Sequence, residues 1–346
     1  MKQNNILNFT YQDFFALFKK YSGRGEYFAK PVYKQIMSTG VFTPEKLSVF
    51  TRSPKILKIL KDNFKIELLQ FENSILADRT EKVIFKTYDN HFIESVIIPM
   101  KSYKTLCISS QIGCAMRCSF CQTADMGLLR NLDVFEIVSQ LYWIKYIKKE
   151  PIRNVVFMGM GEPLDNFDNT LKAIEIFNDI YGFNLKHARI TISTCGLTDK
   201  IDKLALLGSS TCSLAISLNA VTDEIRSKIM PVNKRFNLQV LKDSLLRYQK
   251  KVKRKILIEY VLIKDMNDSL KDAQGLINFS KNINSKINLI PYNPKQNSNL
   301  RSPSFEKCEV FYKYILSKNI KVFNRISKGD KILAACGQLG TKNTML

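Results

Sequence analysis

The sequence predicts an α/β fold: a partial (β/α)6 barrel with a small N-terminal helical domain and a hairpin extension. From about residue 105 onward, apolar strand-like segments alternate with helical stretches, which indicates a parallel sheet. About six such units fit a barrel or partial barrel better than a short open sheet. The length of 346 residues suits two domains, or one barrel with an extension. We therefore divide the chain into residues 1–95 and a core of residues 100–340.

The first 95 residues are expected to form helices followed by one hairpin. Apolar residues recur with helical spacing over residues 11–21 and 30–37, and a further helix is expected to begin within residues 44–50. Residues 83–88 and 92–98 alternate in polarity around the turn pair Asp89-Asn90, which is typical of a β-hairpin. The polar stretch after Pro99 then marks a domain boundary.

The core is expected to contain strands and helices in alternation. Asp133 is a candidate N-cap for the first core helix, over residues 134–141. The other helical stretches are residues 167–179, 200–207, 238–249, 270–281 and 305–317. The strand candidates are residues 105–109, 154–158, 189–193, 213–218, 257–261 and 287–291, with a possible last strand at 320–323.

Composition bounds the class of protein. Hydrophobic residues make up 45% of the chain, which excludes global disorder, and 14 Gly with 10 Pro exclude a collagen-like chain. No stretch reads as a signal peptide or membrane span, so we expect a cytoplasmic protein without membrane contact. With 53 Lys and Arg against 31 Asp and Glu, the net charge is +22. That charge favours a polyanionic partner, although an overall bias toward Lys, Asn and Ile also produces it.

Polar features follow five of the predicted strands at their carboxyl ends. A group of three cysteines follows the first strand, and residues 159–163 follow the second. Ser193 ends the third, Ser217 to Asn219 end the fourth, and Asn293 follows the sixth. Because the carboxyl ends of parallel barrel strands meet at one mouth, these residues predict a single site.

The cysteine triplet Cys114, Cys118 and Cys121 has the spacing C-x3-C-x2-C. A structural zinc site needs four ligands, and the chain has two histidines and no second paired cysteine motif. Three thiolates suit a [4Fe–4S] cluster whose fourth iron takes an exogenous ligand. Three further cysteines are expected to be ordinary packed thiols: Cys195, Cys212 and Cys308.

The triplet resembles the signature of radical S-adenosylmethionine (SAM) enzymes, in which the open iron binds the methionine part of SAM. Six motifs in order then resemble the RlmN family, the dual-specificity adenine C2 methyltransferases of 23S rRNA and tRNA. The resemblance covers residues 80–340. The motifs are CISSQIGC at 107–114, GMGEP at 159–163, IST at 192–194, MPVN at 230–233, PYNP at 291–294 and ACGQL at 335–339.

This resemblance implies a role for each matching residue. Cys336 would carry a methyl group from one SAM, a second SAM would supply the radical, and Cys107 would release the product by forming a disulfide. Glu94, thirteen residues before Cys107, would take the C2 proton. Asn219 departs from the family's usual His. The implied SAM contacts are Gly161, Glu162, Ser193, Ser217, Leu218, Asn219 and Asn293.

The resemblance also implies an electron donor such as flavodoxin or ferredoxin, and we expect a monomer. Candidate RNA-binding residues are Lys19, Lys20 and Arg24 in the N-terminal module. The densest basic run is Lys250, Lys251, Lys253, Arg254 and Lys255, which also suits a solvated helix end.

Two alternatives stay open. A Cfr-like enzyme would methylate C8 of the same rRNA adenosine, but Ile112 and Pro163 favour the C2 enzymes. A non-catalytic, basic RNA-binding metalloprotein would not need the separate pair Cys107 and Cys336.

Overall fold

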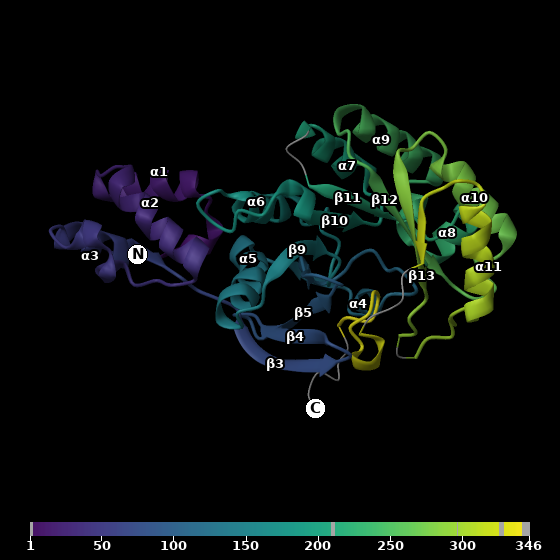
Figure 1. The fold of residues 1–346 in the computed structure, drawn as a ribbon, viewed down its shortest axis with the longest axis horizontal. Coiled ribbons are helices and arrows are strands. Elements are labelled where there is room, and N and C mark those ends of the chain that lie inside the picture. The colour runs from purple at the N-terminus through teal and green to yellow at the C-terminus, as the bar shows by residue number, and fades with distance from the viewer. Residues whose placement is uncertain (1–2, 209–211, 296, 325–328, 341–346) are drawn as a thin grey trace.

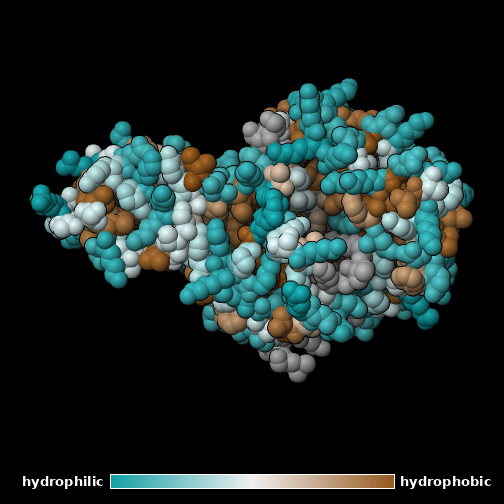
Figure 2. All heavy atoms as spheres, viewed as in Figure 1, coloured by the Kyte–Doolittle hydropathy of each residue, from teal (hydrophilic) through white to brown (hydrophobic). Residues whose placement is uncertain are grey.

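The protein is described by a computed structural model covering residues 3–208, 212–295, 297–324 and 329–340. A ten-stranded sheet forms its centre, with the order β14-β13-β12-β11-β10-β9-β6-β5-β4-β3. An N-terminal helical lobe extends from one side of this body (Figure 1). Figure 2 shows the same two-lobed outline, with hydrophilic side chains over most of the visible face and scattered apolar patches.

The N-terminal lobe contains α1 (Tyr11–Ser22), α2 (Glu26–Lys34) and α3 (Pro54–Asn63). Its first helix begins with a capping box between Thr10 and Asp13 and ends at Gly23 in the left-handed conformation. The strands β1 (Asn4–Asn5) and β2 (Phe64–Lys65) pair in parallel and close the lobe.

Helix prediction in this lobe was only partly right. The first helix is confirmed, but the second begins at Glu26 and continues past Lys34 as a wider turn over Gln35–Thr39. Residues 44–50 form two short 3-10 turns, Pro44–Lys46 and Ser48–Phe50, rather than the start of a long helix. The α-helix that follows, α3, was not predicted, although Ile56, Leu57, Ile59 and Leu60 recur with helical spacing among its five basic or polar residues.

The lobe is attached to the body by specific hydrogen bonds. The Asn8 side chain accepts from the Phe135 N–H at 2.8 Å, and the Ser38 hydroxyl donates to the Tyr181 carbonyl at 3.1 Å. Asp13 pairs with Lys172 at 2.6 Å. These contacts connect the lobe to the body near α5 (Val134–Tyr142) and α6 (Phe167–Asn178).

The predicted hairpin is present and belongs to the central sheet. It consists of β4 (Thr80–Lys86) and β5 (Phe92–Pro99), and β3 (Gln70–Ala77) adds a third antiparallel strand that the sequence did not reveal. Strand β5 pairs antiparallel with β6 (Lys104–Ile108), so the sheet continues across the predicted boundary after Pro99. The division into residues 1–95 and 100–340 stays a prediction.

The barrel prediction is confirmed, because β6 and the six strands that follow it in the central sheet all run parallel. The sheet stays open, with β3 and β14 at its edges. The Asp133 cap of α5 is present as a capping box with Glu136. The strands are β9 (Ile152–Phe157), β10 (Ile190–Thr194), β11 (Ser213–Ser217), β12 (Ile256–Leu262), β13 (Ser285–Pro291) and β14 (Val322–Asn324).

Helices cover the outer face of this sheet, and apolar residues of strands and helices form one continuous core (Figure 1). The remaining helices are α7 (Thr198–Ala205), α8 (Asp223–Ile229), α9 (Leu238–Lys251), α10 (Leu270–Ser280) and α11 (Phe305–Leu316). Among the described residues, no helix is both long and apolar enough to cross a membrane.

Candidate active site

The three clustered cysteines lie on a loop between β7 (Gln111–Gly113) and the short helix α4 (Gln122–Asp125). Strand β7 pairs with β8 (Leu128–Asn131) in a small hairpin that the sequence did not predict. The Cys114 N–H donates to the Gly127 carbonyl at 2.9 Å, and the Ser119 N–H donates to the Ile229 carbonyl at 2.9 Å. The loop is thus held at both ends before any metal binds.

Gly113 is required for this loop. Its φ of +76° lies in the left-handed region, and a Cβ there would stand 1.7 Å from the Gly127 carbonyl oxygen. Any other residue would therefore separate β7 from β8 and displace Cys114.

The three thiols fit a [4Fe–4S] cluster. All three line one cavity of about 160 Å³, together with the carboxyl ends of the barrel strands. Burial raises the pKa of Cys114 to about 12, and it also raises the pKa of Cys118 well above the ordinary thiol value. Thiolates at these positions therefore need the positive charge of a bound metal group.

The arrangement does not suit a single ion. In the parts of the chain that the structure describes, no three His, Cys, Asp or Glu side chains are placed to hold one metal ion. In a cubane cluster each cysteine binds a different iron, so the thiolates stand further apart than the ligands of one ion.

Most of the predicted SAM contacts line the same cavity. Gly161 and Glu162 follow β9, and Gly161 has a φ of +96° that brings the backbone against Gln111. Asn293 does not line this cavity, and neither does Leu218, which is fully buried. The Leu218 backbone N–H donates to the Glu259 carbonyl at 2.9 Å. The cavity-lining residues among those predicted are Gly161, Glu162, Ser193, Ser217 and Asn219.

Glu162 lines the cavity and also accepts hydrogen bonds from the backbone around it. Its two carboxylate oxygens accept from the Leu164 N–H at 3.1 Å and the Cys195 N–H at 2.8 Å. Burial raises the pKa of Glu162 despite these bonds. Because each carboxylate oxygen has a second lone pair, the group can still accept from an ammonium in the cavity.

Asn219 suits its backbone position. Its φ is +59°, and Asn tolerates the left-handed region better than most residues. Its Oδ1 accepts from the Val261 N–H at 2.9 Å, and its Nδ2 donates to the Met230 sulfur at 3.3 Å. The side chain that replaces the expected His therefore connects the ends of β11 and β12 while lining the cavity.

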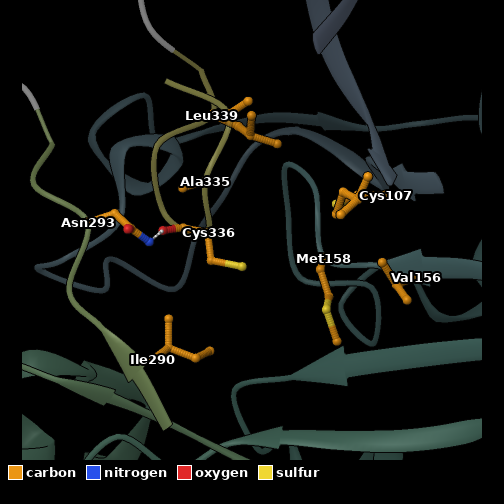
Figure 3. A pocket seen from close by; sticks show the side chains of 10 residues that line it. Cys107, Val156, Met158, Ile290, Asn293, Ala335, Cys336 and Leu339 are labelled. Atoms are coloured by element: carbon orange, nitrogen blue, oxygen red, sulfur yellow. Dashed lines mark hydrogen bonds between the residues drawn. The ribbon is translucent and has the colours of Figure 1, made fainter. Parts of the chain in front are cut away.

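Cys107 and Cys336 meet at a second, narrower cavity of about 30 Å³. Cys107 comes from β6, and Cys336 comes from residues 329–340, near the end of the described chain. Figure 3 shows the sulfur of Cys336 pointing into the space in front of Met158, with Cys107 on the other side. Met158 and Cys336 also line the cavity of the cluster cysteines, so the two cavities adjoin. The Asn293 Nδ2 donates to the Cys336 carbonyl at 3.3 Å.

The segment 329–340, which we call the C-terminal segment, is fixed to the cysteine loop. The Gly337 carbonyl accepts from the Gln122 N–H at 2.6 Å, and the Leu339 carbonyl accepts from the Thr123 hydroxyl at 2.8 Å. Gly337 has a φ of +86°, and a Cβ there would stand 3.1 Å from the Phe120 carbonyl. The position of Cys336 thus depends on helix α4, which begins directly after Cys121.

Glu94 lies on β5 and is 2% exposed, so it is not the solvated hairpin residue that the sequence alone would favour. Its Oε2 accepts from the Gly340 N–H at 2.9 Å, and its backbone carbonyl accepts from the Ser109 hydroxyl at 2.6 Å. It does not line either cavity, but it touches the C-terminal segment four residues beyond Cys336.

Sequence reasoning missed Arg226, which is fully buried on α8. Its guanidinium donates to the carbonyls of Leu218 at 3.0 Å and Cys195 at 2.7 Å, and to Asn233 Oδ1 at 3.0 Å. It thereby fixes the carboxyl ends of β10 and β11. The available signal was its place four residues before the MPVN motif, but Arg in a short charged helix usually lies on the surface.

The sequence also gave no indication of Cys195 or Glu259. Both line the cavity of the cluster cysteines, and Ser193 donates to the Glu259 carboxylate at 3.0 Å. Cys195 was interpreted as an ordinary packed thiol, and the structure instead places it at the wall of the site. Cys308 is buried in α11, away from both cavities.

Comparisons with known proteins agree with this geometry. Residues 108–277 match the radical SAM superfamily. A Protochlamydia amoebophila protein named probable dual-specificity RNA methyltransferase RlmN 1 is 41% identical, over 97% of this chain and 94% of that protein. The chain belongs to the RlmN family. A Geobacter sulfurreducens protein named dual-specificity RNA methyltransferase RlmN is also 41% identical, over 92% of this chain and 88% of that protein.

A solved structure extends the match to nearly the whole fold. The crystal structure of a radical SAM methyltransferase from Sphaerobacter thermophilus superposes with a TM-score of 0.89 and 31% identity. It covers 97% of this chain and 98% of that chain. RlmN-family membership makes the protein a radical SAM enzyme that uses SAM and a [4Fe–4S] cluster, and it favours catalysis over the non-catalytic metalloprotein.

Proposed function

We propose that this enzyme methylates C2 of a specific adenosine in 23S rRNA and in tRNA, with Cys336 as methyl carrier. Cys107 is the resolving thiol and Glu94 the general base. The observation that carries the proposal is the common cavity of Cys107 and Cys336, which adjoins the cavity of the three cluster cysteines. Two thiols from distant parts of the chain, next to a cluster site, suit a reaction that passes a carbon group between sulfur and RNA.

The first step is a polar methyl transfer to Cys336. Its thiolate forms a bond to the methyl carbon of SAM while the bond from that carbon to the sulfonium sulfur breaks, which leaves S-adenosylhomocysteine. C2 of adenine is electrophilic, so it cannot displace the methyl of SAM directly. A cysteine carrier is therefore needed before carbon–carbon bond formation.

The second SAM supplies a radical. Cys114, Cys118 and Cys121 would hold the cluster, which would supply the single electron that cleaves this SAM, and the methyl on Cys336 would lose one hydrogen atom to the resulting radical chemistry. The methylene carbon held by Cys336 then bonds to C2 of the adenine. Two SAM molecules are consumed in each turnover, one as methyl donor and one as radical source.

Glu94 and Cys107 complete the reaction. Glu94 takes the proton from C2, and the adduct becomes closed-shell by losing one electron, which would return to the cluster that Cys114, Cys118 and Cys121 would hold. The Cys107 thiolate then attacks the Cys336 sulfur, the sulfur–methylene bond breaks, and the released carbon is protonated to a methyl group. The product leaves with a Cys107–Cys336 disulfide on the enzyme, which two electrons from a reductant reopen.

The adenine must leave its stack to reach Cys336. A cavity of about 30 Å³ holds roughly one water molecule, so a base enters only when side chains around Cys336 move. The proposed SAM contacts are Gly161, Glu162, Ser193, Ser217 and Asn219, with Leu218 positioned behind the wall and Asn293 on the Cys336 side.

The N-terminal lobe is the proposed RNA-binding module. The exposed Lys19 and Lys20 lie at the end of α1, and the exposed Arg24 follows it, next to exposed Tyr21 and Tyr27. Cations beside exposed aromatic rings suit backbone contact and base stacking. The basic run at residues 250–255 joins the end of α9 to the start of β12, so it lies at the end of the sheet opposite the site.

We expect the triple variant Lys19→Ala, Lys20→Ala, Arg24→Ala to bind tRNA more weakly and with less salt dependence. The slope of log K against log salt is negative, and loss of three phosphate contacts reduces its magnitude by about 2. Fluorescence anisotropy with labelled tRNA over a salt series measures this slope. The matched control is Lys250→Ala, Lys251→Ala, Lys253→Ala, which removes the same charge. Equal loss in both variants would show that net charge alone binds RNA.

The proposed reaction is tested by anaerobic turnover with SAM, a reductant and RNA, followed by nucleoside mass spectrometry. We expect 2-methyladenosine in both 23S rRNA and tRNA substrates. Finding 8-methyladenosine in rRNA alone would assign the Cfr-like alternative, and finding neither would overturn the proposed function. The Cys308→Ala variant, altered far from both cavities, should give the wild-type product.

The resemblance to RlmN enzymes also supports a monomeric enzyme reduced by flavodoxin or ferredoxin. A cytoplasmic location stays a prediction.

A further inference from the structure

A buried ion pair stands beside the proposed general base. Lys82 on β4 and Glu94 on β5 are each 2% exposed, and the Lys82 Nζ lies 3.5 Å from Glu94 Oε1. In the register of the two strands Lys82 faces Val96, and Ile84 faces Glu94. Lys82 and Glu94 are therefore diagonal neighbours on the same face of the sheet. Burying an ammonium is unfavourable unless a partner compensates its charge, so this pairing is a specific feature of the fold.

The same face carries the resolving thiol. Cys107 on β6 faces Val96, so Lys82, Val96 and Cys107 form one row across three strands, and Glu94 lies in the next row. The opposite side of Glu94 touches the C-terminal segment through the Gly340 N–H. Glu94 is thus packed between the strand of Cys107 and the segment of Cys336. The described titratable groups that share this face of the sheet with Glu94 are Lys82, Lys86 and Cys107, and Lys82 is the one that forms an ion pair with it.

Opposing influences act on the Glu94 carboxyl group. Burial raises its pKa above the ordinary value, while the Lys82 ammonium and the Gly340 N–H lower it. Lys82 supplies the only full positive charge among these influences. Removal of Lys82 would therefore raise the pKa of Glu94 further and favour the protonated carboxyl group, which cannot accept a proton.

We infer that Lys82 is a positioning residue that keeps Glu94 ionised and holds its carboxylate in place beside the C-terminal segment. This inference rests on the proposed function, in which Glu94 takes the C2 proton of the adenine. Lys82 is buried and lines neither of the two cavities that the reactants enter. Lys82 therefore acts through Glu94 and does not contact the RNA base.

The test compares Lys82→Met with Lys86→Met. Met has a similar length and no charge, and Lys86 lies on the same strand and face, where it is partly exposed. Three quantities are measured for each variant: methylation of Cys336 by intact-protein mass spectrometry, total RNA methylation at pH 7, and the pH dependence of 2-methyladenosine formation. Methylation of Cys336 precedes any need for Glu94, so it reports on folding and SAM binding alone.

We expect Lys82→Met to methylate Cys336 like the wild type but to form product about tenfold more slowly at pH 7, because loss of the cation raises the pKa of Glu94. The direction of the shift in the pH profile follows from the role of Glu94 as a base. Product formation rises with pH as Glu94 loses its proton, and removal of the cation moves that rise to higher pH. Lys86→Met should leave the rise at its wild-type pH.

The Lys82→Arg variant is the control for misfolding of Lys82→Met. It keeps the cation, so its pH profile should stay at the wild-type position even if its rate falls. A wild-type profile in Lys82→Met, with normal Cys336 methylation, would reduce Lys82 to a structural ion pair. If the pH profile of product formation in Lys82→Arg moves to higher pH although the cation is retained, Lys82 is likewise reduced to a structural ion pair. If the wild-type enzyme makes no 2-methyladenosine, the proposed function itself fails, and that result is distinct from an unshifted profile.

Discussion

Replacing Cys336 by Ala abolishes RNA methylation, with an expected loss of about 10⁴-fold or more, as when a covalent nucleophile is removed. Cys336 lines both cavities, so it is the one thiol placed to receive a methyl group at the SAM site and to face Cys107. Without its sulfur, no carbon group can be held beside the adenine. Transfer of a radiolabelled methyl group from SAM to RNA measures the loss, with nucleoside mass spectrometry as the second readout.

Two controls separate this effect from damage to the fold. The Cys308→Ala variant removes a buried thiol in α11 and should stay active. Iron content and the iron–sulfur absorption of Cys336→Ala should match the wild type, because the three cluster cysteines are intact. Labelled methyl groups still appearing on RNA would contradict the carrier role and would point to direct transfer from SAM.

Replacing Cys107 by Ala is expected to trap the enzyme on its substrate. Cys107 lies across the narrow cavity from Cys336, and the adduct cannot be released without a thiolate that attacks the Cys336 sulfur. A single turnover should therefore leave RNA covalently attached to the protein, with almost no free methylated RNA. Denaturing gel electrophoresis detects the shifted band, and mass spectrometry of a nuclease digest locates the attachment at Cys336.

The double variant Cys107→Ala, Cys336→Ala gives the matched control. It keeps the first substitution but lacks the attachment point, so it should give neither adduct nor product. A shifted band in the double variant would mean that a different residue bonds to RNA. Recovery of free methylated RNA from Cys107→Ala would mean that another group, such as an external thiol, resolves the adduct.

The fold was largely readable from the sequence because a parallel barrel repeats a strong local signal. Each buried strand is a short apolar run, and each outer helix has its own apolar face, so their alternation is visible without tertiary contacts. Strand β3 was missed for the opposite reason: its residues are mostly exposed or half-buried, so its pairing with β4 is its main support. The hairpin β7–β8 is set by the close approach of Gly113 and Gly127, which local patterns do not report.

The site was predictable where a motif carries the chemistry in its own spacing. The three cluster cysteines fall within eight residues, so their proximity is a property of the chain itself. Other site residues gave no such signal. Arg226 and Lys82 are long charged side chains in charged surroundings, and such residues are normally solvated. Only the packed structure buries them and gives each its partners.

The sequence by itself therefore determined the barrel, the cysteine loop and the resemblance that names Cys107, Cys336 and Glu94, because these depend on local periodicity and spacing. Tertiary structure decided how they meet. Sheet register places Lys82, Glu94 and Cys107 on one face, and the bonds of Gln122, Thr123 and Glu94 to the C-terminal segment bring Cys336 to the same mouth. Strand pairing, and the docking of the C-terminal segment on α4 and β5, join residues that are far apart in the sequence. No local stretch of sequence contains both partners of such a contact.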